Sequence, residues 1–168
     1  MDSIRNVLCD IFSRVLWGTP WSVPSIFQAE RFMEDIRRGD EDGVRAFIKK
    51  YPKQFDEQMY SGTTALYQAV DAGQAKMVDL LLQAGARPDI RAWSDTQPLY
   101  WACLQDQVDF DIVRSLLQHG ATPSDKSGIL SSMDLAQIYH AKGDSRLLDM
   151  IGDEFDRRLK AHQAAELA

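Results

Sequence analysis

Residue types that carry covalent catalysis are scarce in this chain, which has two cysteines and three histidines. Nucleophilic catalysis requires a cysteine, serine or lysine that is activated by a nearby base. His119 occupies an expected helix end, where a polar or cationic group is favourable, and His140 and His162 fall on helices nearer the C-terminus. Cys103 takes a position for a small residue and Cys9 lies at the edge of an apolar stripe, so both thiols are expected to pack. We therefore expect no catalytic residues and no enzyme.

Metal and cofactor chemistry is equally poorly supported by the pattern. Asp109 and Asp111 alternate in one segment, but the Asp-x-Asp-x-Asp-Gly framework of a calcium loop, with its distant Glu, is missing. The cysteines form no C-x-x-C pair, and the glycines fall at expected helix ends rather than in a phosphate-binding loop. We expect no metal site and no cofactor.

Composition limits the class of protein. The chain has 168 residues, 45% of them hydrophobic and 26% charged, which is typical of one globular domain. A formal net charge of −6 argues against nonspecific binding to nucleic acid. No apolar run approaches the roughly 18 residues of a membrane span. Charged residues interrupt the N-terminal apolar pattern, unlike a signal peptide, and the cysteines suggest a reducing compartment. We expect a cytoplasmic location.

The middle of the chain contains an internal repeat of about 33 residues. Each copy has apolar residues at helical spacing, a small residue before a turn, a second apolar segment and a Gly-Ala terminator. The first copy contains Leu66, Ala69, Val70, Met77, Val78, Leu81, Leu82, Gly85 and Ala86. The second contains Leu99, Ala102, Cys103, Ile112, Val113, Leu116, Leu117, Gly120 and Ala121. This pattern predicts two short antiparallel helices per copy.

These residues resemble the ankyrin repeat. Weaker copies flank the two clear ones, so we expect four units at about 27–60, 61–92, 93–126 and 127–152. The resemblance implies an all-α ankyrin-repeat solenoid of helix-turn-helix units. Residues 1–26 would add an N-terminal amphipathic capping helix with a Trp/Pro connector, and residues 153–168 would extend the last helix.

Departures from the family pattern predict local differences. Tyr67 and Tyr100 stand where the family usually has His, and Gln97 replaces Thr. The third unit has extra residues between its helices, so the segment 105–111 is expected to protrude. In the fourth unit, we expect a longer first helix.

The N-terminal segment carries an amphipathic stripe. Its apolar residues recur at helical spacing and are Ile4, Val7, Leu8, Ile11, Phe12, Val15 and Leu16. This helix would cap the first repeat, or dock to a partner or a second copy. Its polar face lacks the excess of basic residues that favours a membrane surface.

The resemblance also implies a concave groove lined by the turns between units and by the exposed surface of each first helix. The partner-binding residues carried over from it are Tyr60, Ser61, Gln68, Asp71, Trp93, Asp95, Trp101, Leu104, Gln105, Asp109 and Phe110. Their aromatic centre would be surrounded by acidic residues, among them Asp56, Glu57 and Asp89. An apolar anchor with an acidic rim favours a basic protein partner.

The sequence therefore predicts a non-enzymatic protein-binding module that is monomeric when free and binds neither nucleic acid nor membrane. Its small size and acidity suggest an inhibitor, antitoxin or immunity protein. The alternative is an adaptor or assembly subunit that docks into a larger complex through its N-terminal helix.

Overall fold

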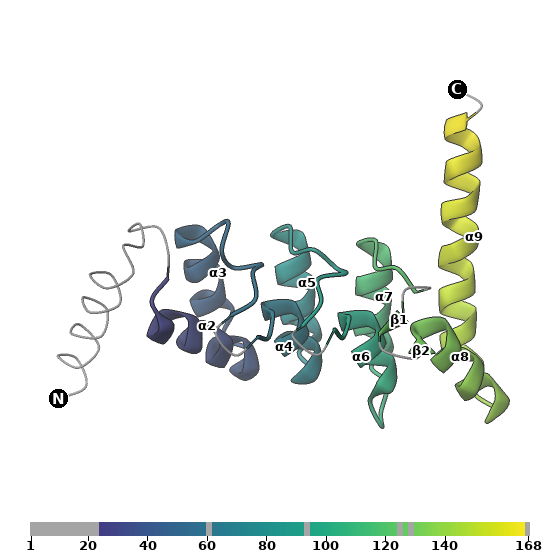
Figure 1. The fold of residues 1–168 in the computed structure, drawn as a ribbon, viewed down its shortest axis with the longest axis horizontal. Coiled ribbons are helices and arrows are strands. Elements are labelled where there is room, and N and C mark those ends of the chain that lie inside the picture. The colour runs from purple at the N-terminus through teal and green to yellow at the C-terminus, as the bar shows by residue number, and fades with distance from the viewer. Residues whose placement is uncertain (1–23, 60–61, 93–94, 124–125, 128–129, 167–168) are drawn as a thin grey trace. The chain divides into compact units, whose positions relative to one another are not determined.

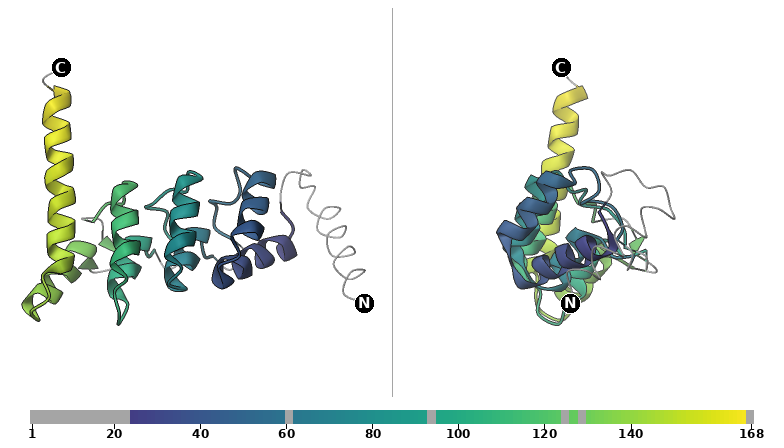
Figure 2. Two further views of the ribbon diagram at one scale, coloured as in Figure 1. Left: turned by 180° about the vertical axis from the view of Figure 1, so that it is seen from behind. Right: turned by 90° about the vertical axis from the view of Figure 1, so that its left-hand side faces the viewer.

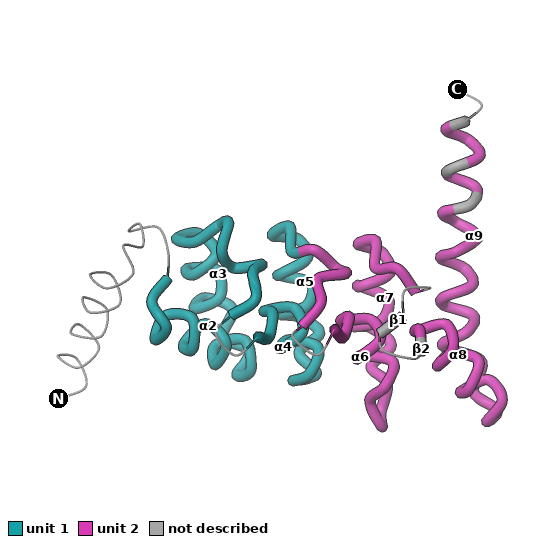
Figure 3. The backbone as a smooth tube through the Cα atoms, in the orientation of Figure 1, with its two compact units in different colours: residues 1–86 teal, residues 87–168 magenta. Residues whose placement is uncertain are grey.

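The computed structural model describes residues 24–59, 62–92, 95–123, 126–127 and 130–166. The expected N-terminal helix and nearly all of its connector lie outside these residues, as do Cys9, Tyr60, Ser61 and Trp93. The chain forms two compact units, residues 1–86 (unit 1) and residues 87–168 (unit 2) (Figure 3).

Unit 1 contains two pairs of helices (Figure 1). The first pair is α2 (Ile26–Arg38) and α3 (Glu41–Lys50), and the second is α4 (Ala65–Asp71) and α5 (Ala75–Gln83). The first helices of the two pairs, α2 and α4, pack against each other. This confirms the helix-turn-helix pattern predicted for this half of the chain.

Local signals explain where these helices begin and end. Ser25 starts α2 through a capping box with Gln28, and the Thr64 hydroxyl accepts a hydrogen bond of 3.1 Å from the backbone N–H of Tyr67 at the start of α4. Gly39 ends α2 with φ 73°, and Gly73 follows α4 with φ 64°. Both angles lie in the left-handed region, which glycine adopts at little cost.

The core of unit 1 is formed by the repeating apolar residues. Leu66, Val78 and Leu81 are fully buried. In the first pair, the rings of Phe32 and Phe47 stack with centroids 3.9 Å apart. Burying such apolar surface provides the main free energy that holds short helices together.

Unit 2 repeats the arrangement with α6 (Pro98–Leu104), α7 (Phe110–Gln118), α8 (Ser132–Ala141) and α9 (Arg146–Glu166). Its first helices, α6 and α8, pack together, as do α7 and α9. A hairpin of two-residue strands, β1 (Lys126–Ser127) and β2 (Leu130–Ser131), precedes α8. Within the described residues, the protein is therefore all-α apart from this hairpin.

Two predicted details of unit 2 can be compared with the structure. The first helix of the fourth pair, α8, spans ten residues and α6 spans seven, which confirms the longer helix. The segment 105–111 is not entirely a loop, because Asp109 caps α7 and the helix already begins at Phe110. The Asp109 carboxylate satisfies two backbone N–H groups of the first turn, and this starts the helix earlier than expected.

The last helix, α9, fixes the end of α7 within unit 2. Figure 2 shows α9 extending well past its neighbours in this unit. The Arg158 guanidinium donates hydrogen bonds to the carbonyl oxygens of Leu117 at 3.1 Å and Ala121 at 2.8 Å. Carbonyls at a helix C-terminus lack partners within the helix. The Leu117 carbonyl oxygen also accepts a hydrogen bond of 3.0 Å from the Gly120 N–H, so Arg158 adds a second donor there and a donor to Ala121.

Candidate functional site

The four first helices present exposed side chains at equivalent positions. One exposed position near the end of each helix recurs at about one repeat length, and its occupants are Arg37, Asp71, Leu104 and Ile138. One turn earlier come Glu34, Gln68 and Trp101, which are partly exposed, and Leu135, which is buried. We call the exposed side chains of α2 and α4 the first-helix face of unit 1, and those of α6 and α8 the first-helix face of unit 2.

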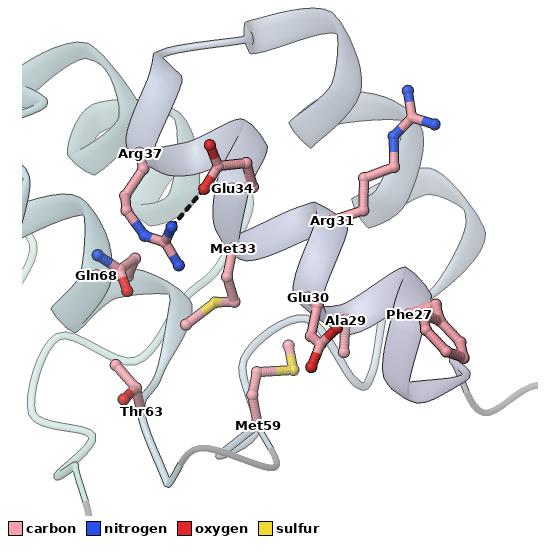
Figure 4. Close-up of a pocket in the computed structure, with 10 residues that line it drawn as sticks. All are labelled: Phe27, Ala29, Glu30, Arg31, Met33, Glu34, Arg37, Met59, Thr63 and Gln68. Atoms are coloured by element: carbon pink, nitrogen blue, oxygen red, sulfur yellow. Dashed lines mark hydrogen bonds and ion pairs between the residues drawn. The ribbon is translucent and has the colours of Figure 1, made fainter. Parts of the chain in front are cut away.

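A groove of about 620 Å³ opens on the first-helix face of unit 1. Met33 from α2 and Met59 from the turn before α4 reach into it from two sides, and Phe27 lines one end (Figure 4). Methionine side chains are flexible and polarisable and adapt to varied apolar partners. The groove can therefore accept an apolar side chain of a ligand.

The rim of this groove is charged but balanced. Arg37 and Glu34 form an ion pair at the rim, and Glu34 also accepts a hydrogen bond of 2.6 Å from Arg38 (Figure 4). Gln68, one of the predicted partner-binding residues, lines the groove from α4. Glu34, in contrast, is held by two arginines of its own helix, so it supplies little negative charge to attract a basic ligand.

Asp71 lies beyond this groove, at the exposed end of α4. Burial raises the pKa of Tyr67, and the negative charge of Asp71 raises it further. Tyr67 therefore stays protonated at neutral pH and retains a hydroxyl group for hydrogen bonding.

The first-helix face of unit 2 carries two large exposed apolar side chains, next to the exposed polar residues Gln137 and His140 of α8. Leu104 is 44% exposed and Ile138 is 41% exposed, and Trp101 lies one turn before Leu104 on α6. No residue of α6 carries a charge at neutral pH. Large exposed apolar side chains on neighbouring helices are typical of a surface that another molecule covers.

Hydrogen bonds hold the ends of α6 and α8 in place. Gln105 donates from its side-chain amide to the carbonyl oxygen of Trp101 at 3.3 Å, and the Tyr139 hydroxyl donates to the carbonyl oxygen of Gln105 at 3.3 Å. Gln105, predicted to contact a partner, thus also links two helices of its own unit. These contacts set the positions from which Leu104 and Ile138 project.

Several acidic residues that we expected at a rim are used within unit 2. The Asp89 carboxylate accepts hydrogen bonds from the Thr122 backbone N–H at 2.8 Å and hydroxyl at 2.7 Å. The Asp95 carboxylate lies 3.2 Å from the Arg91 guanidinium, and the Asp109 side chain caps α7. Asp106 differs: it is exposed and makes no hydrogen bond or ion pair with the residues that the structure describes. Fewer acidic groups are therefore left to attract a basic partner than the number of acidic residues in the sequence suggests.

Asp95 and Phe110 have further roles within the fold. Asp95 has φ 57°, and the equivalent residue of unit 1, Gly62, has φ 73°. The guanidinium of Arg146 lies 4.4 Å from the centroid of the Phe110 ring. This cation–π contact links the start of α7 to the start of α9.

Sequence reasoning missed the part of the groove that α2 contributes. Phe27, Met33 and Arg37 line it, yet no residue of α2 was predicted to bind. The signal was present, because one repeat length before Gln68 and Asp71 come Glu34 and Arg37. The predicted Tyr60, Ser61 and Trp93 lie outside the described residues.

Two described residues that could support catalysis, Cys103 and His119, make contacts within the fold. Burial raises the pKa of the Cys103 thiol to about 12, so it is not a thiolate at neutral pH. The Nδ1 atom of His119 lies 2.9 Å from the carbonyl oxygen of Ser115 at the end of α7.

Among the described residues, no three His, Cys, Asp or Glu side chains are grouped to hold a metal ion. In the same part of the chain, no helix has the length and apolar character needed to cross a membrane.

Comparison with known proteins gives consistent results. A family model described as ankyrin repeats, in three copies, matches residues 32–127. Protein phosphatase 1 regulatory subunit 27 of Mus musculus is 36% identical over 90 residues, and its Homo sapiens counterpart is 34% identical over 90 residues. Each alignment covers 54% of this chain and 57% of the relative. The chain thus spans little more than half the length of these curated relatives.

Proposed function

This chain belongs to the ankyrin-repeat family, and from that premise we propose that it is a non-catalytic module that binds a protein partner through the exposed faces of its first helices. Ankyrin repeats indicate protein–protein interaction. The assignment to these faces rests on a contrast between buried and exposed positions of the repeat. Leu66 and Leu99 are equivalent and both fully buried, but Asp71 and Leu104 are equivalent, exposed and chemically unlike.

That contrast separates scaffold positions from recognition positions. A buried position must keep its volume in every repeat to preserve close packing. An exposed position is free of this requirement, and its side chains set affinity and specificity for a partner. The apolar anchors, Phe27 and Met59 in unit 1 and Leu104 in unit 2, would supply most of the binding free energy.

A basic partner is the second part of the proposal. It is supported by the net charge of −6 and by two exposed acidic residues. Asp71 is the last residue of α4, and Asp106 lies two residues after the end of α6. Acidic groups near an apolar anchor speed the association of a basic partner and orient it. By covering a functional surface of that partner, the module would act as an inhibitor.

Selection of ligands from a displayed random-peptide library tests this proposal. Peptides of about 16 residues, long enough for four helical turns, are selected on the full chain. Ligands should lose affinity for Asp71→Arg or Leu104→Gln chains and keep it for Arg45→Ala and Gln118→Ala chains, whose changes lie on the second helices α3 and α7. Ligands with the opposite pattern, or no ligand at all, would refute the proposed surface.

Regulation of a protein phosphatase is a second candidate function, favoured by the names of the mouse and human relatives. The test is to mix the full chain with the catalytic subunit of protein phosphatase 1. Co-elution in size-exclusion chromatography and a changed rate of dephosphorylation of a protein substrate are expected. Separate elution and an unchanged rate would reject this candidate and leave the binding of other partners open to the peptide selection.

A further inference from the structure

The first-helix face of unit 2 has the features of a surface for one class of ligand, and the inference drawn from it rests on the proposed function. Leu104 and Ile138 occupy equivalent positions at the exposed ends of α6 and α8, which pack together. Trp101 extends the apolar area along α6. The equivalent residues in unit 1, Arg37 and Asp71, are charged. An apolar residue at this repeat position is therefore found in unit 2 and not in unit 1, and the fold does not require it.

The spacing of the two anchors indicates the length of ligand that can contact both. Packed helices have axes about 8–10 Å apart, so equivalent side chains on α6 and α8 are separated by about that distance. A helical ligand rises about 1.5 Å per residue, so its residues i and i+7 are about 10.5 Å apart on one face. One apolar stripe of a helix can therefore contact Leu104 and Ile138 together.

Backbone hydrogen bonding favours a helix over an extended ligand. An extended segment laid on this face would remove its backbone N–H and C=O groups from water. Its side-chain partners on α6 would be few, because the helix presents mainly apolar groups and the Gln105 amide already donates to the Trp101 carbonyl. A helix satisfies its own backbone groups and needs only apolar contact.

Charges flanking the face give the ligand a direction. Asp106 is exposed two residues after Leu104, at the α6 side of the face. Lys142 follows Ile138 at the end of α8, and its ammonium lies 5.9 Å from the Tyr139 ring centroid. Opposite charges at the two sides favour a ligand with a basic residue near the α6 side and no basic residue near the α8 side.

We infer that the first-helix face of unit 2 binds an amphipathic α-helix of a partner protein, with apolar residues at i and i+7 and a Lys or Arg next to the end that lies over α6. Leu104 and Ile138 are the apolar anchors, Trp101 widens the contact and Asp106 pairs with the basic residue. The partner is thus defined by its helical pattern and by the position of its charge.

The test uses the full chain and the same displayed library, with a depletion step against a Leu104→Gln, Ile138→Gln double variant. Only peptides that need this face survive depletion. Glutamine keeps the helices favourable and removes the apolar anchors, and thermal unfolding followed by circular dichroism checks that the double variant is folded. Phe155→Gln is the matched control, because Phe155 is 59% exposed on α9 of the same unit.

Recovered peptides should show apolar residues at i and i+7 and a basic residue near one end. A proline placed between the two apolar residues should lower affinity about tenfold or more, because it breaks the helix. Asp106→Lys should weaken these peptides and strengthen versions with Glu in place of the basic residue. Phe155→Gln should leave affinity unchanged.

Three results would overturn the inference. Recovered peptides that tolerate the central proline would show that the ligand is extended. Basic peptides that Asp106→Lys does not weaken, or recovered peptides with an acidic residue in place of the basic one, would contradict the pairing with Asp106. A wild-type dimer in sedimentation that becomes monomeric in the double variant would show that a second copy covers this face. If peptides bind only the first-helix face of unit 1, this inference fails and the proposed function stands, whereas the absence of any ligand removes both.

Discussion

The first-helix faces of the two units differ, although the scaffolds beneath them match. Val78 in unit 1 and Val113 in unit 2 are equivalent and fully buried, as are Leu81 and Leu116. On the surface, unit 1 has a groove with methionines inside and ion pairs at its rim, and unit 2 has exposed leucine and isoleucine. The valine and leucine ladder of the second helices is therefore kept where it is fully buried, whereas the exposed positions of the first helices differ between the units.

The turns before α4 and α6 provide a second comparison. The N–H of Met59 donates to the carbonyl oxygen of Thr63 at 2.9 Å, and the N–H of Ala92 donates to that of Thr96 at 3.0 Å. The left-handed residue is Gly62 in one turn and Asp95 in the other. One backbone geometry is thus reached with different side chains.

The largest effect is expected from truncating the matched core leucines. Leu81→Ala in unit 1 and Leu116→Ala in unit 2 should each lower the free energy of unfolding by about 2–5 kcal/mol, because each leaves a cavity at a fully buried position. Urea unfolding followed by circular dichroism measures both. A loss below 1 kcal/mol in only one variant would break the equivalence of the two scaffolds.

Arg158→Ala is expected to cost about 2 kcal/mol of the free energy of unfolding, since it removes the donor to two carbonyl oxygens at the end of α7. Arg157→Ala is the control, because Arg157 and Arg158 both pair with Glu154 but the Arg157 side chain is 63% exposed. That control should cost less than about 0.5 kcal/mol. Equal losses in the two variants would contradict the capping role of Arg158.

Substitution of Asp95 tests the comparison between the turns. Asp95→Val should lower the free energy of unfolding by about 1–2 kcal/mol, because a β-branched residue is strained at φ 57°. Asp95→Gly copies the turn of unit 1 and should change it by less than about 0.5 kcal/mol. Chemical denaturation distinguishes them, and a stable valine variant would mean that the turn adopts another conformation.

Cys103→Val tests whether the thiol only packs. Valine occupies the equivalent position in unit 1, Val70, so the substitution should cost less than about 1.5 kcal/mol and leave ligand binding unchanged. In a Cys9→Ser background, Cys103 should react with a disulfide reagent at pH 8 only after unfolding, since burial raises its pKa to about 12. Rapid reaction of the folded protein would contradict this burial.

The smallest effect concerns Asp144. Hydrogen bonds from Arg146 to the Asp144 carboxylate lower the pKa of that group. Any stability from the pair is present above the ordinary carboxyl pKa and is lost as pH falls through the lowered one. Arg146→Ala should raise the Asp144 pKa toward its ordinary value, as measured by NMR titration of the carboxyl carbon. An unchanged titration would exclude Arg146 as the cause.

Much of the fold could be predicted because the repeat appears directly in the sequence. The spacing of Leu66, Leu99 and the terminal glycines indicated the paired helices and their ends. The sequence did not show which acids the chain itself uses. Asp89 binds Thr122, one repeat later in the chain, and such a contact between turns leaves no local signal. The contribution of α2 to the groove was missed because the first repeat is degenerate, although its register with Gln68 was available.

Chemical-shift mapping tests the central claim most directly. A peptide selected on the full chain is titrated into ¹⁵N-labelled protein, and the backbone amides are followed by NMR. The largest changes are expected on α2, α4, α6 and α8 and on the turns that precede them. Changes concentrated on α3, α5, α7 and α9 would show that the second helices carry recognition and would contradict the central claim.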